Sequence, residues 1–236
     1  MEQSEQRPEG QVPPIETDNR AEKVDRLFEF FFINKNLIIG ATLGVIAIVG
    51  VFFLYQQQNK SDESVAYSLL SQVEAHVDNG NWQHAVDGDS TLTGLRQIIQ
   101  EYGSTPSGNH AKILIGDSFL ALQEADSALT YYRTYTGKNP DLAASAKAGE
   151  AACFLHKKAF PEAAAAFEKA SETAVNHALK ASYLSDAADT YFLLGKTDMA
   201  VDLYKRIIKK YPGFTATAKA QESLLAIAGK TGNIDL

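Results

Sequence analysis

The side chains best suited to catalysis or metal binding are scattered along the chain. The histidines show none of the spacings, such as His-Glu-x-x-His, that bring two imidazoles to one helix face: they are His76, His84, His110, His156 and His177. Asp87-Gly88-Asp89 resembles the start of a calcium loop but lacks the distal glutamate of an EF-hand loop, so we interpret it as a turn. Cys153 lies in an apolar helical pattern, which favours a buried thiol over a nucleophile. We therefore expect no enzymatic activity, no metal site and no cofactor.

The overall composition indicates a folded, acidic protein. The chain has 236 residues, 45% of them hydrophobic, with 22 Lys+Arg against 29 Asp+Glu and a net charge of -7. This composition excludes a wholly disordered chain. The acidic balance argues against nucleic acid as the main partner, because phosphate neutralisation needs a basic surface.

One uncharged, strongly apolar run lies near the N-terminus. Residues 37–55 contain no charge, and a helix of this length spans about 28 Å, close to the hydrocarbon thickness of a bilayer. We predict a transmembrane helix over 37–55, preceded by a polar, disordered arm over 1–26 and an aromatic juxtamembrane segment over 27–36. A cleavable signal peptide is the main alternative, but its apolar region is usually about 7–15 residues long and followed by a small-residue cleavage site.

Flanking cations predict the orientation of this helix. Lys23, Arg26 and Lys35 precede the run, whereas only Lys60 closely follows it. The positive-inside rule then places the N-terminus in the cytoplasm and residues 56–236 outside it. Within the run, Gly40 and Gly44 have the small-xxx-small spacing that lets two membrane helices approach, although glycine is also simply common in such helices.

Residues 181–212 show a pattern of small and aromatic residues that predicts a pair of helices. Counted from Ala181 as place 1, Ala188 is at place 8, Tyr191 at 11, Gly195 at 15, Ala200 at 20, Tyr204 at 24 and Pro212 at 32. This is similar to the tetratricopeptide repeat, in which small residues let antiparallel helices touch and aromatic residues fill the space beside them.

The same places recur upstream. From Asn109 they hold Gly116, Phe119, Ala128, Tyr132 and Pro140, and from Ala144 they hold Ala151, Phe154, Ala163 and Phe167. A degenerate copy covers about 66–106, with His76 at the aromatic place 11 and extra residues within 87–94, and a helix over 215–228 reads as a terminal cap. The predicted fold is therefore all-α: a tetratricopeptide-type helical-hairpin solenoid, with repeats at about 66–106, 109–140, 144–175 and 181–212, preceded by one transmembrane helix.

The repeat pattern also predicts a binding groove. In tetratricopeptide domains, first-helix places such as 2, 5, 9, 12 and 13 usually line the concave surface. Here these places include His110, Ile113, Asp117 and Leu120, then Ala148, Ala152, Leu155 and His156, and finally Ser185, Asp189, Phe192 and Leu193. The Lys, Asn and Arg residues of the family's carboxylate clamp are missing. We expect the lining to suit extended or unfolded apolar segments of a protein partner, and a weakly specific scaffold surface is the alternative.

A basic cluster lies near the end of the last repeat's second helix. It consists of Lys205, Arg206, Lys209 and Lys210. Cations at a helix C-terminus interact favourably with the helix dipole, which explains the cluster without a partner. Whether it also contacts an acidic partner stays open.

The order of arm, anchor and repeats resembles the ancillary SecYEG translocon subunits, or YfgM-like proteins, of Gram-negative bacteria. The resemblance extends over residues 27–229 and includes the Phe-rich approach to the anchor, Gly40, Gly44 and Gly50 within it, and the repeat pattern. It implies a single-pass protein of the inner membrane with a periplasmic domain over 56–236, associated with the translocon, periplasmic chaperones and exported chains. We expect a membrane-anchored, non-enzymatic adaptor. The alternative is a structural scaffold for envelope assembly without unfolded clients.

Overall fold

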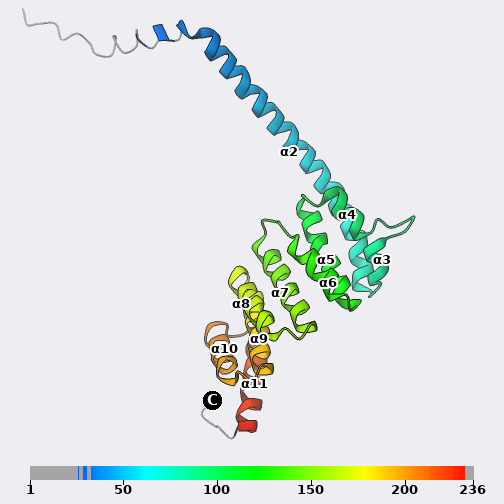
Figure 1. Cartoon of the computed structure of the whole chain (residues 1–236), viewed down its shortest axis with the longest axis vertical. Helices are drawn as coiled ribbons and strands as arrows, with labels where there is room; N and C mark the ends of the chain where they lie inside the picture. Colours follow the sequence, from blue (N-terminus) through cyan, green and yellow to red (C-terminus); the bar gives the residue numbers. More distant parts are fainter. Residues whose placement is uncertain (1–25, 27–28, 31–32, 232–236) are drawn as a thin grey trace, which may run out of the picture. The chain divides into compact units, whose positions relative to one another are not determined.

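The described part of the chain is helical throughout. A computed structural model describes residue 26, residues 29–30 and residues 33–231, so most of the expected arm over 1–26 lies outside the described residues (Figure 1). Within the described residues every regular element is a helix, apart from an isolated β-bridge between Gly88 and Thr93. The prediction of an all-α fold is confirmed. The chain divides into two compact units, Met1–Gln56 and Gln57–Leu236, and each is described by itself.

The first unit contains the apolar segment. Helix α2 runs from Lys35 to Asp78, and its segment Lys35–Leu54 has a mean hydropathy of 2.7 with none of it buried. By length and composition this segment can cross a membrane, although a signal sequence near an N-terminus has the same features. Nothing lies within 4 Å of a Cβ built on Gly40 or Gly44. The side of α2 that carries these two glycines is therefore open to a neighbouring helix.

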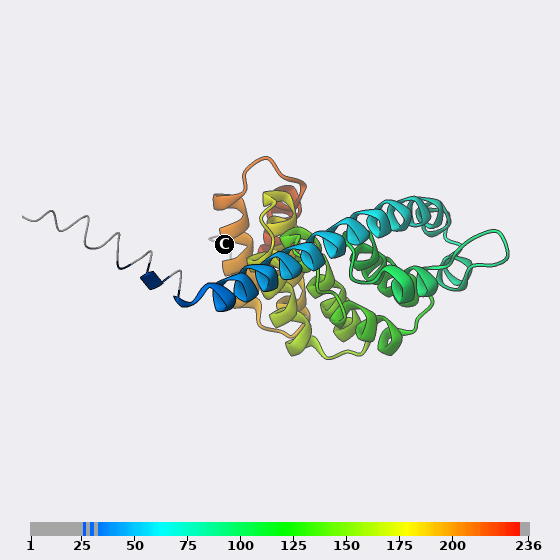
Figure 2. The ribbon, with the colours of Figure 1, turned by 90° about the horizontal axis from the view of Figure 1, so that it is seen from above.

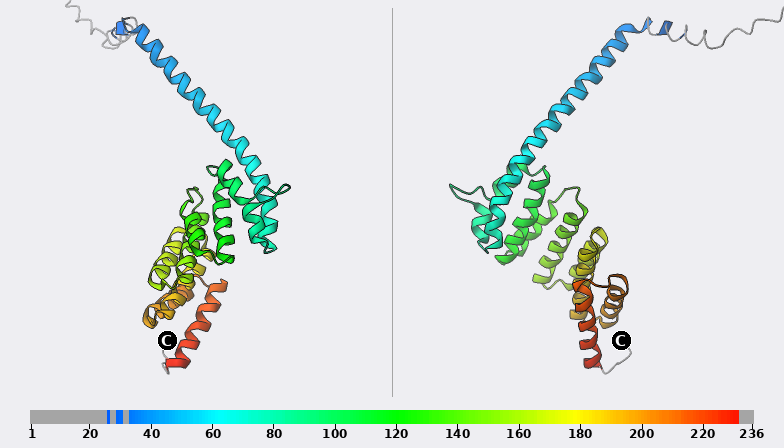
Figure 3. Two further views of the ribbon diagram at one scale, coloured as in Figure 1. Left: turned by 45° about the vertical axis from the view of Figure 1, so that its right-hand side comes forward. Right: turned by 180° about the vertical axis from the view of Figure 1, so that it is seen from behind.

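The second unit is a series of helix pairs. The end of α2 is followed by α3 (Trp82–Asp87) and α4 (Leu95–Tyr102), and a loop over 88–94 projects between them (Figure 2). Three pairs follow: α5 (Pro106–Ala121) with α6 (Ala125–Arg133), α7 (Pro140–His156) with α8 (Phe160–Thr173), and α9 (His177–Leu193) with α10 (Thr197–Lys210). Helix α11 (Thr215–Thr231) packs against both α9 and α10 (Figure 3). Helix α5 also contacts α7, and α9 contacts α11, so these first helices lie side by side.

Side-chain caps fix where the first helices begin. Thr105 accepts a hydrogen bond from the Gly108 amide at the start of α5. Asn139 and Asn176 cap α7 and α9 in the same way, each accepting from two backbone amides. Such caps satisfy donors that a helix start would leave unpaired.

A left-handed residue ends each first helix at place 15. Gly80, Gln123, Lys158 and Gly195 all have positive φ, between 59° and 76°. In every case the next residue's amide donates to the carbonyl of place 11, as Lys196 does to Tyr191. This is the hydrogen-bond pattern of a Schellman turn, in which the αL residue is usually glycine. The turn therefore repeats in geometry even where the sequence has Gln or Lys.

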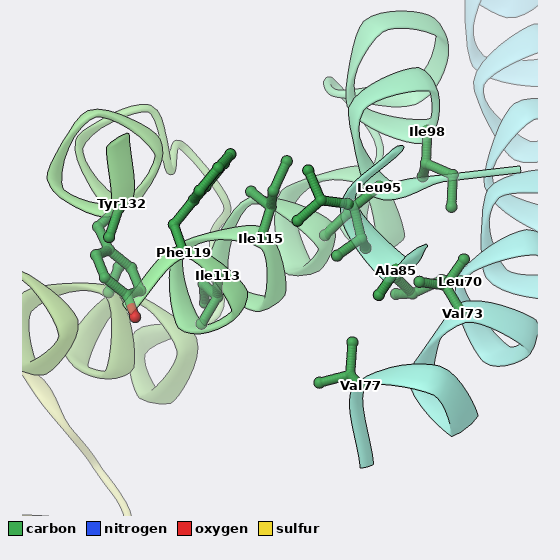
Figure 4. Packing of buried hydrophobic residues seen from close by; sticks show 14 of the residues in the cluster. Leu70, Val73, Val77, Ala85, Leu95, Ile98, Ile113, Ile115, Phe119 and Tyr132 are labelled. Atoms are coloured by element: carbon green, nitrogen blue, oxygen red, sulfur yellow. The ribbon is translucent and has the colours of Figure 1, made fainter. Parts of the chain in front are cut away.

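Two buried clusters hold the unit together. In the first, side chains from α2, α3, α4 and α5 converge, among them Val73, Leu95 and Ile115 (Figure 4). The second joins α9, α10 and α11 through Leu184, Ile207 and Ile227. Burial of such side chains supplies the main free energy of folding.

Candidate protein-binding face on the first helices of the repeats

Helices α5, α7, α9 and α11 form one surface, which we call the first-helix face. Polar contacts connect neighbouring helices within it. The Ser145 Oγ lies 3.0 Å from the Tyr183 hydroxyl, joining α7 to α9. The Lys219 ammonium lies 2.6 Å from the Asp189 carboxylate, joining α11 to α9. These contacts hold consecutive first helices at fixed separations.

Cavities open between neighbouring first helices. One of about 330 Å³ lies between the N-terminal halves of α9 and α11 and is lined by residues that include Leu179, Ser185, Asp186 and Lys219. A second, of about 280 Å³, lies between their C-terminal halves and is lined by Asp189, Phe192, Leu193, Tyr204, Ser223, Ala226, Ile227 and Lys230. A third, of about 240 Å³, lies where α2, α5 and the start of α7 meet. We call the first two the acidic cavity and the apolar cavity.

The predicted lining residues differ widely in exposure. Asp117, His156 and Leu193 are exposed; His110, Leu120, Ala148, Ala152, Leu155, Asp189 and Phe192 are half-buried; Ile113 and Ser185 are buried. Leu193, with 64% of its surface exposed, is the large apolar side chain of this set that is most accessible.

The burial of Ile113 corrects the expected lining. Only 5% of its surface is exposed, and it belongs to the first core cluster because α5 packs against α3 and α7. Leu120 packs against the first cluster and Phe192 against the second, so part of each of these side chains is committed to folding. Contacts between consecutive helices therefore cover much of the apolar surface that we expected to be free to bind a partner.

Two of the predicted acidic residues accept hydrogen bonds from repeat tyrosines. The Tyr132 hydroxyl donates to the Asp117 carboxylate at 2.5 Å, and the Tyr204 hydroxyl donates to Asp189. Although Asp117 is exposed as a residue, its carboxylate is partly shielded from water where it meets Tyr132, and this desolvation raises its pKa, while the hydrogen bond from Tyr132 opposes the shift. Burial also raises the pKa of Tyr132, so its hydroxyl remains a donor at neutral pH.

The sequence carries a signal for this pairing that place-by-place matching overlooks. Tyrosine at place 24 occurs with aspartate at place 9 in two repeats, as in the Tyr132–Asp117 pair. The middle repeat has Phe167 and Ala152 at the same places. A buried hydroxyl needs an acceptor, whereas a phenyl ring does not.

The histidines and the Asp87–Asp89 segment form a local network. His84 lies between His76, with 3.2 Å between their Nδ1 atoms, and Asp89, whose Oδ2 is 3.0 Å from the His84 Nε2. His76, at the aromatic place 11 of its repeat, is half-buried and packs edge-on against the His84 ring. Asp89 also accepts from the amides of Thr91 and Leu92, and the Thr91 bonds hold its pKa well below its usual range. This is the geometry of a turn.

The remaining candidates for chemistry are structurally committed. Cys153 is fully buried in α7, and burial raises the pKa of its thiol to about 12, which keeps it protonated at neutral pH. Among the described residues no group of three His, Cys, Asp or Glu side chains is arranged to hold a metal ion. The basic cluster of Lys205, Arg206, Lys209 and Lys210 is exposed on α10, the second helix of its pair.

Comparison with known families agrees with this architecture. Two family models, both described as tetratricopeptide repeat, match residues 113–177 and 184–213. The chain contains tetratricopeptide repeats. No curated protein matches the chain. Tetratricopeptide repeats mediate contacts between proteins and are typically non-enzymatic, so the repeats indicate an adaptor or scaffold with protein partners.

Proposed function

We propose that this protein is a membrane-anchored, non-enzymatic adaptor of the Gram-negative cell envelope. Its N-terminus lies in the cytoplasm, α2 crosses the inner membrane, and the tetratricopeptide repeats lie in the periplasm. There the first-helix face binds exported polypeptides beside the SecYEG translocon, or binds a periplasmic chaperone that receives them. The resemblance to YfgM-like translocon subunits supports this assignment.

The anchor rests on the apolar segment of α2. Lys35–Leu54 is 20 residues long, and none of it is buried. A fully exposed apolar helix is unfavourable in water, so it requires either a bilayer or removal as a signal sequence. Lys23, Arg26 and Lys35 precede the uncharged run over 37–55, whereas only Lys60 closely follows it, and this bias favours retention of the N-terminus in the cytoplasm.

The apolar cavity is the observation that carries the binding function. It is formed mostly by apolar side chains and lies beside Leu193, which is largely exposed. Burial of Leu193 by a partner would be favourable by roughly 1–2 kcal/mol. The Lys230 ammonium lies 5.5 Å from the centre of the Phe192 ring, and this ring forms an aromatic wall of the cavity. Such a cavity suits an apolar side chain of an extended segment.

One observation favours the alternative, a scaffold for folded envelope proteins. Leu120, Leu155 and Phe192 are half-buried against the core. Fewer apolar side chains are therefore accessible on this face than an extended, unfolded client would bind best. A folded partner needs a smaller apolar patch within a polar rim.

Photocrosslinking in living cells separates these two functions. A photoreactive amino acid replaces Leu193, and the matched control replaces Met199, which is exposed on the second helix α10. The adaptor predicts adducts with newly exported chains or translocon subunits from position 193 but not from 199. Adducts confined to folded envelope proteins would establish the scaffold instead.

The orientation is tested by a reporter that is active only in the periplasm, fused after Leu236 of the full chain. We expect activity, with the full-length polypeptide in the membrane fraction. A shorter form that begins after Tyr55 would show that the apolar segment is a cleaved signal sequence.

A further inference from the structure

The acidic cavity contains a buried hydroxyl without a partner. Ser185, with 1% of its surface exposed, contributes to the cavity wall, and its Oγ has no hydrogen-bond partner among the described residues. The equivalent place 5 holds Ile113 and Ala148 in the two preceding repeats, where no hydrogen bond is needed. Buried polar groups are normally paired, so an orphaned hydroxyl at the edge of a cavity points to a ligand group.

The charges around this cavity do not balance. Among the described residues, the Asp186 carboxylate in its wall and the neighbouring Asp189 carboxylate share one cation, Lys219, which leaves a net charge of -1 for these three side chains. Lys219 lies 2.6 Å from Asp189 but 3.6 Å from Asp186. Asp189 also accepts from the Tyr204 hydroxyl, so Asp186 is the less satisfied of the two carboxylates.

The protonation properties agree with this geometry. Burial raises the pKa of Asp186, although Lys219 opposes this. Burial lowers the pKa of Lys219, but the two carboxylates outweigh this effect and raise it. Lys219, the one cation among the described residues that line this cavity, therefore stays charged and paired with Asp186 and Asp189, so it is not available to an anionic ligand.

We propose that the acidic cavity binds a lysine or arginine side chain of an extended segment in a protein partner. Its ammonium or guanidinium group donates to the Asp186 carboxylate and to the Ser185 Oγ. Its methylene stem lies against Leu179 and Phe214, which form the apolar wall of the cavity. This assignment rests on the proposed function, since it names a feature of the polypeptide that the first-helix face binds.

The distance between the acidic and the apolar cavity predicts a preferred spacing between two side chains of the bound segment. Both cavities lie between α9 and α11, one near Ser182 and the other near Phe192. Ten helical residues span about 15 Å, a distance that an extended chain covers in about four or five residues. The favoured partner therefore carries a basic residue and a large apolar residue about four or five positions apart.

A guest-residue series of labelled peptides tests this assignment with the full chain in a neutral detergent. The host is a short fluorescein-labelled peptide with one leucine and, at the stated spacing, a guest Lys, Arg, Glu or norleucine, which is uncharged but keeps the apolar stem. We expect the Lys and Arg guests to bind about tenfold more tightly than the norleucine guest, as a charge-assisted hydrogen bond predicts. The Glu guest should bind most weakly.

Variants then locate the effect. Asp186→Asn should abolish the preference for the Lys and Arg guests, and Ser185→Ala should weaken binding of these two guests but not of the norleucine guest. Asp202→Asn on the exposed face of α10 should change nothing. Thermal unfolding of each variant verifies folding. Equal affinity for Lys and norleucine guests with the unmodified chain would overturn this assignment while leaving the proposed function intact. If no guest peptide bound, both would be overturned.

Discussion

At the scale of single residues, the paired tyrosine and aspartate explain why acidic side chains lie on the first-helix face. Tyr132 and Tyr204 fill the space between helices, and their hydroxyls need acceptors that Asp117 and Asp189 provide. The repeat over 144–175 has Phe167 and Ala152 at the same places, so it has no hydroxyl there and needs no acceptor. The acidic character of this face is therefore partly a consequence of repeat packing.

A double-mutant cycle tests this pairing. Asp117→Ala leaves a buried tyrosine hydroxyl unpaired and should destabilise the protein by about 1–3 kcal/mol. Tyr132→Phe should cost less, because Asp117 is exposed and water can replace the hydroxyl. The double variant imitates Phe167 and Ala152, so it should cost clearly less than the sum of the single variants. Strictly additive changes in urea unfolding would show that the two side chains act independently.

Cys153 should report unfolding of its repeat. The folded pKa of the Cys153 thiol is about 12, above its unfolded value of 9.0, so between these pH values the unfolded chain loses this proton while the folded chain keeps it. The stability of the protein should therefore be unaffected by this thiol below the unfolded pKa and should fall progressively as the pH rises from there toward 12. At pH 8 we expect a thiol reagent such as Ellman's reagent to modify the folded chain very slowly and the urea-unfolded chain rapidly. Fast modification under native conditions would contradict the burial of Cys153.

At the scale of the helices, the contact between α5, α6 and α7 depends on two glycines. The Tyr132 ring lies between Gly116 on α5 and Gly149 on α7, and a Cβ built on Gly116 would come within 2.6 Å of the ring. A Cβ on Gly149 would also overlap the ring. The absence of a side chain at both positions lets three helices meet around one aromatic residue.

Gly149→Ala should therefore destabilise the protein by about 1 kcal/mol or more, even though alanine favours helix formation. The matched control is Gly229→Ala on α11, where a new Cβ meets nothing within 4 Å. That variant should leave stability unchanged or raise it by about 0.5 kcal/mol. Thermal unfolding of both variants decides the point, and a stabilised Gly149→Ala protein would rule out the steric account.

Much of the packing between helices could be predicted from the sequence, because the residues at places 8, 20 and 24 of each repeat make direct contacts between helices. Ala188, Ala200 and Tyr204 are all buried as the repeat pattern predicts. The burial of Ile113 could not be predicted, since it depends on how α3 and α7 pack against α5. The αL conformation of Lys158 was equally hidden, because glycine, the usual signal for it, is absent.

At the scale of the whole molecule, α2 contributes both the apolar segment and part of the first repeat. In its C-terminal half, the Glu63 carboxylate accepts hydrogen bonds from the Ser107 amide and hydroxyl at 2.9 and 2.8 Å. A carboxylate at the start of α5 also interacts favourably with the helix dipole. The repeats are thus joined through one helix to the segment that we assign to the membrane.

The central claim is that the first-helix face binds unfolded exported chains through exposed apolar side chains. Leu193→Ser tests it, because this side chain is largely exposed and its loss should leave the melting temperature nearly unchanged. Phe192→Ser is the contrasting variant, since its half-buried ring should cost stability as well as binding.

The decisive measurement is the affinity of the full chain, in a neutral detergent, for an outer-membrane protein diluted from urea. The account predicts that Leu193→Ser weakens this affinity roughly fivefold, equivalent to about 1 kcal/mol of lost apolar burial, with an unchanged melting temperature. An unchanged affinity in a fully folded Leu193→Ser protein would contradict it.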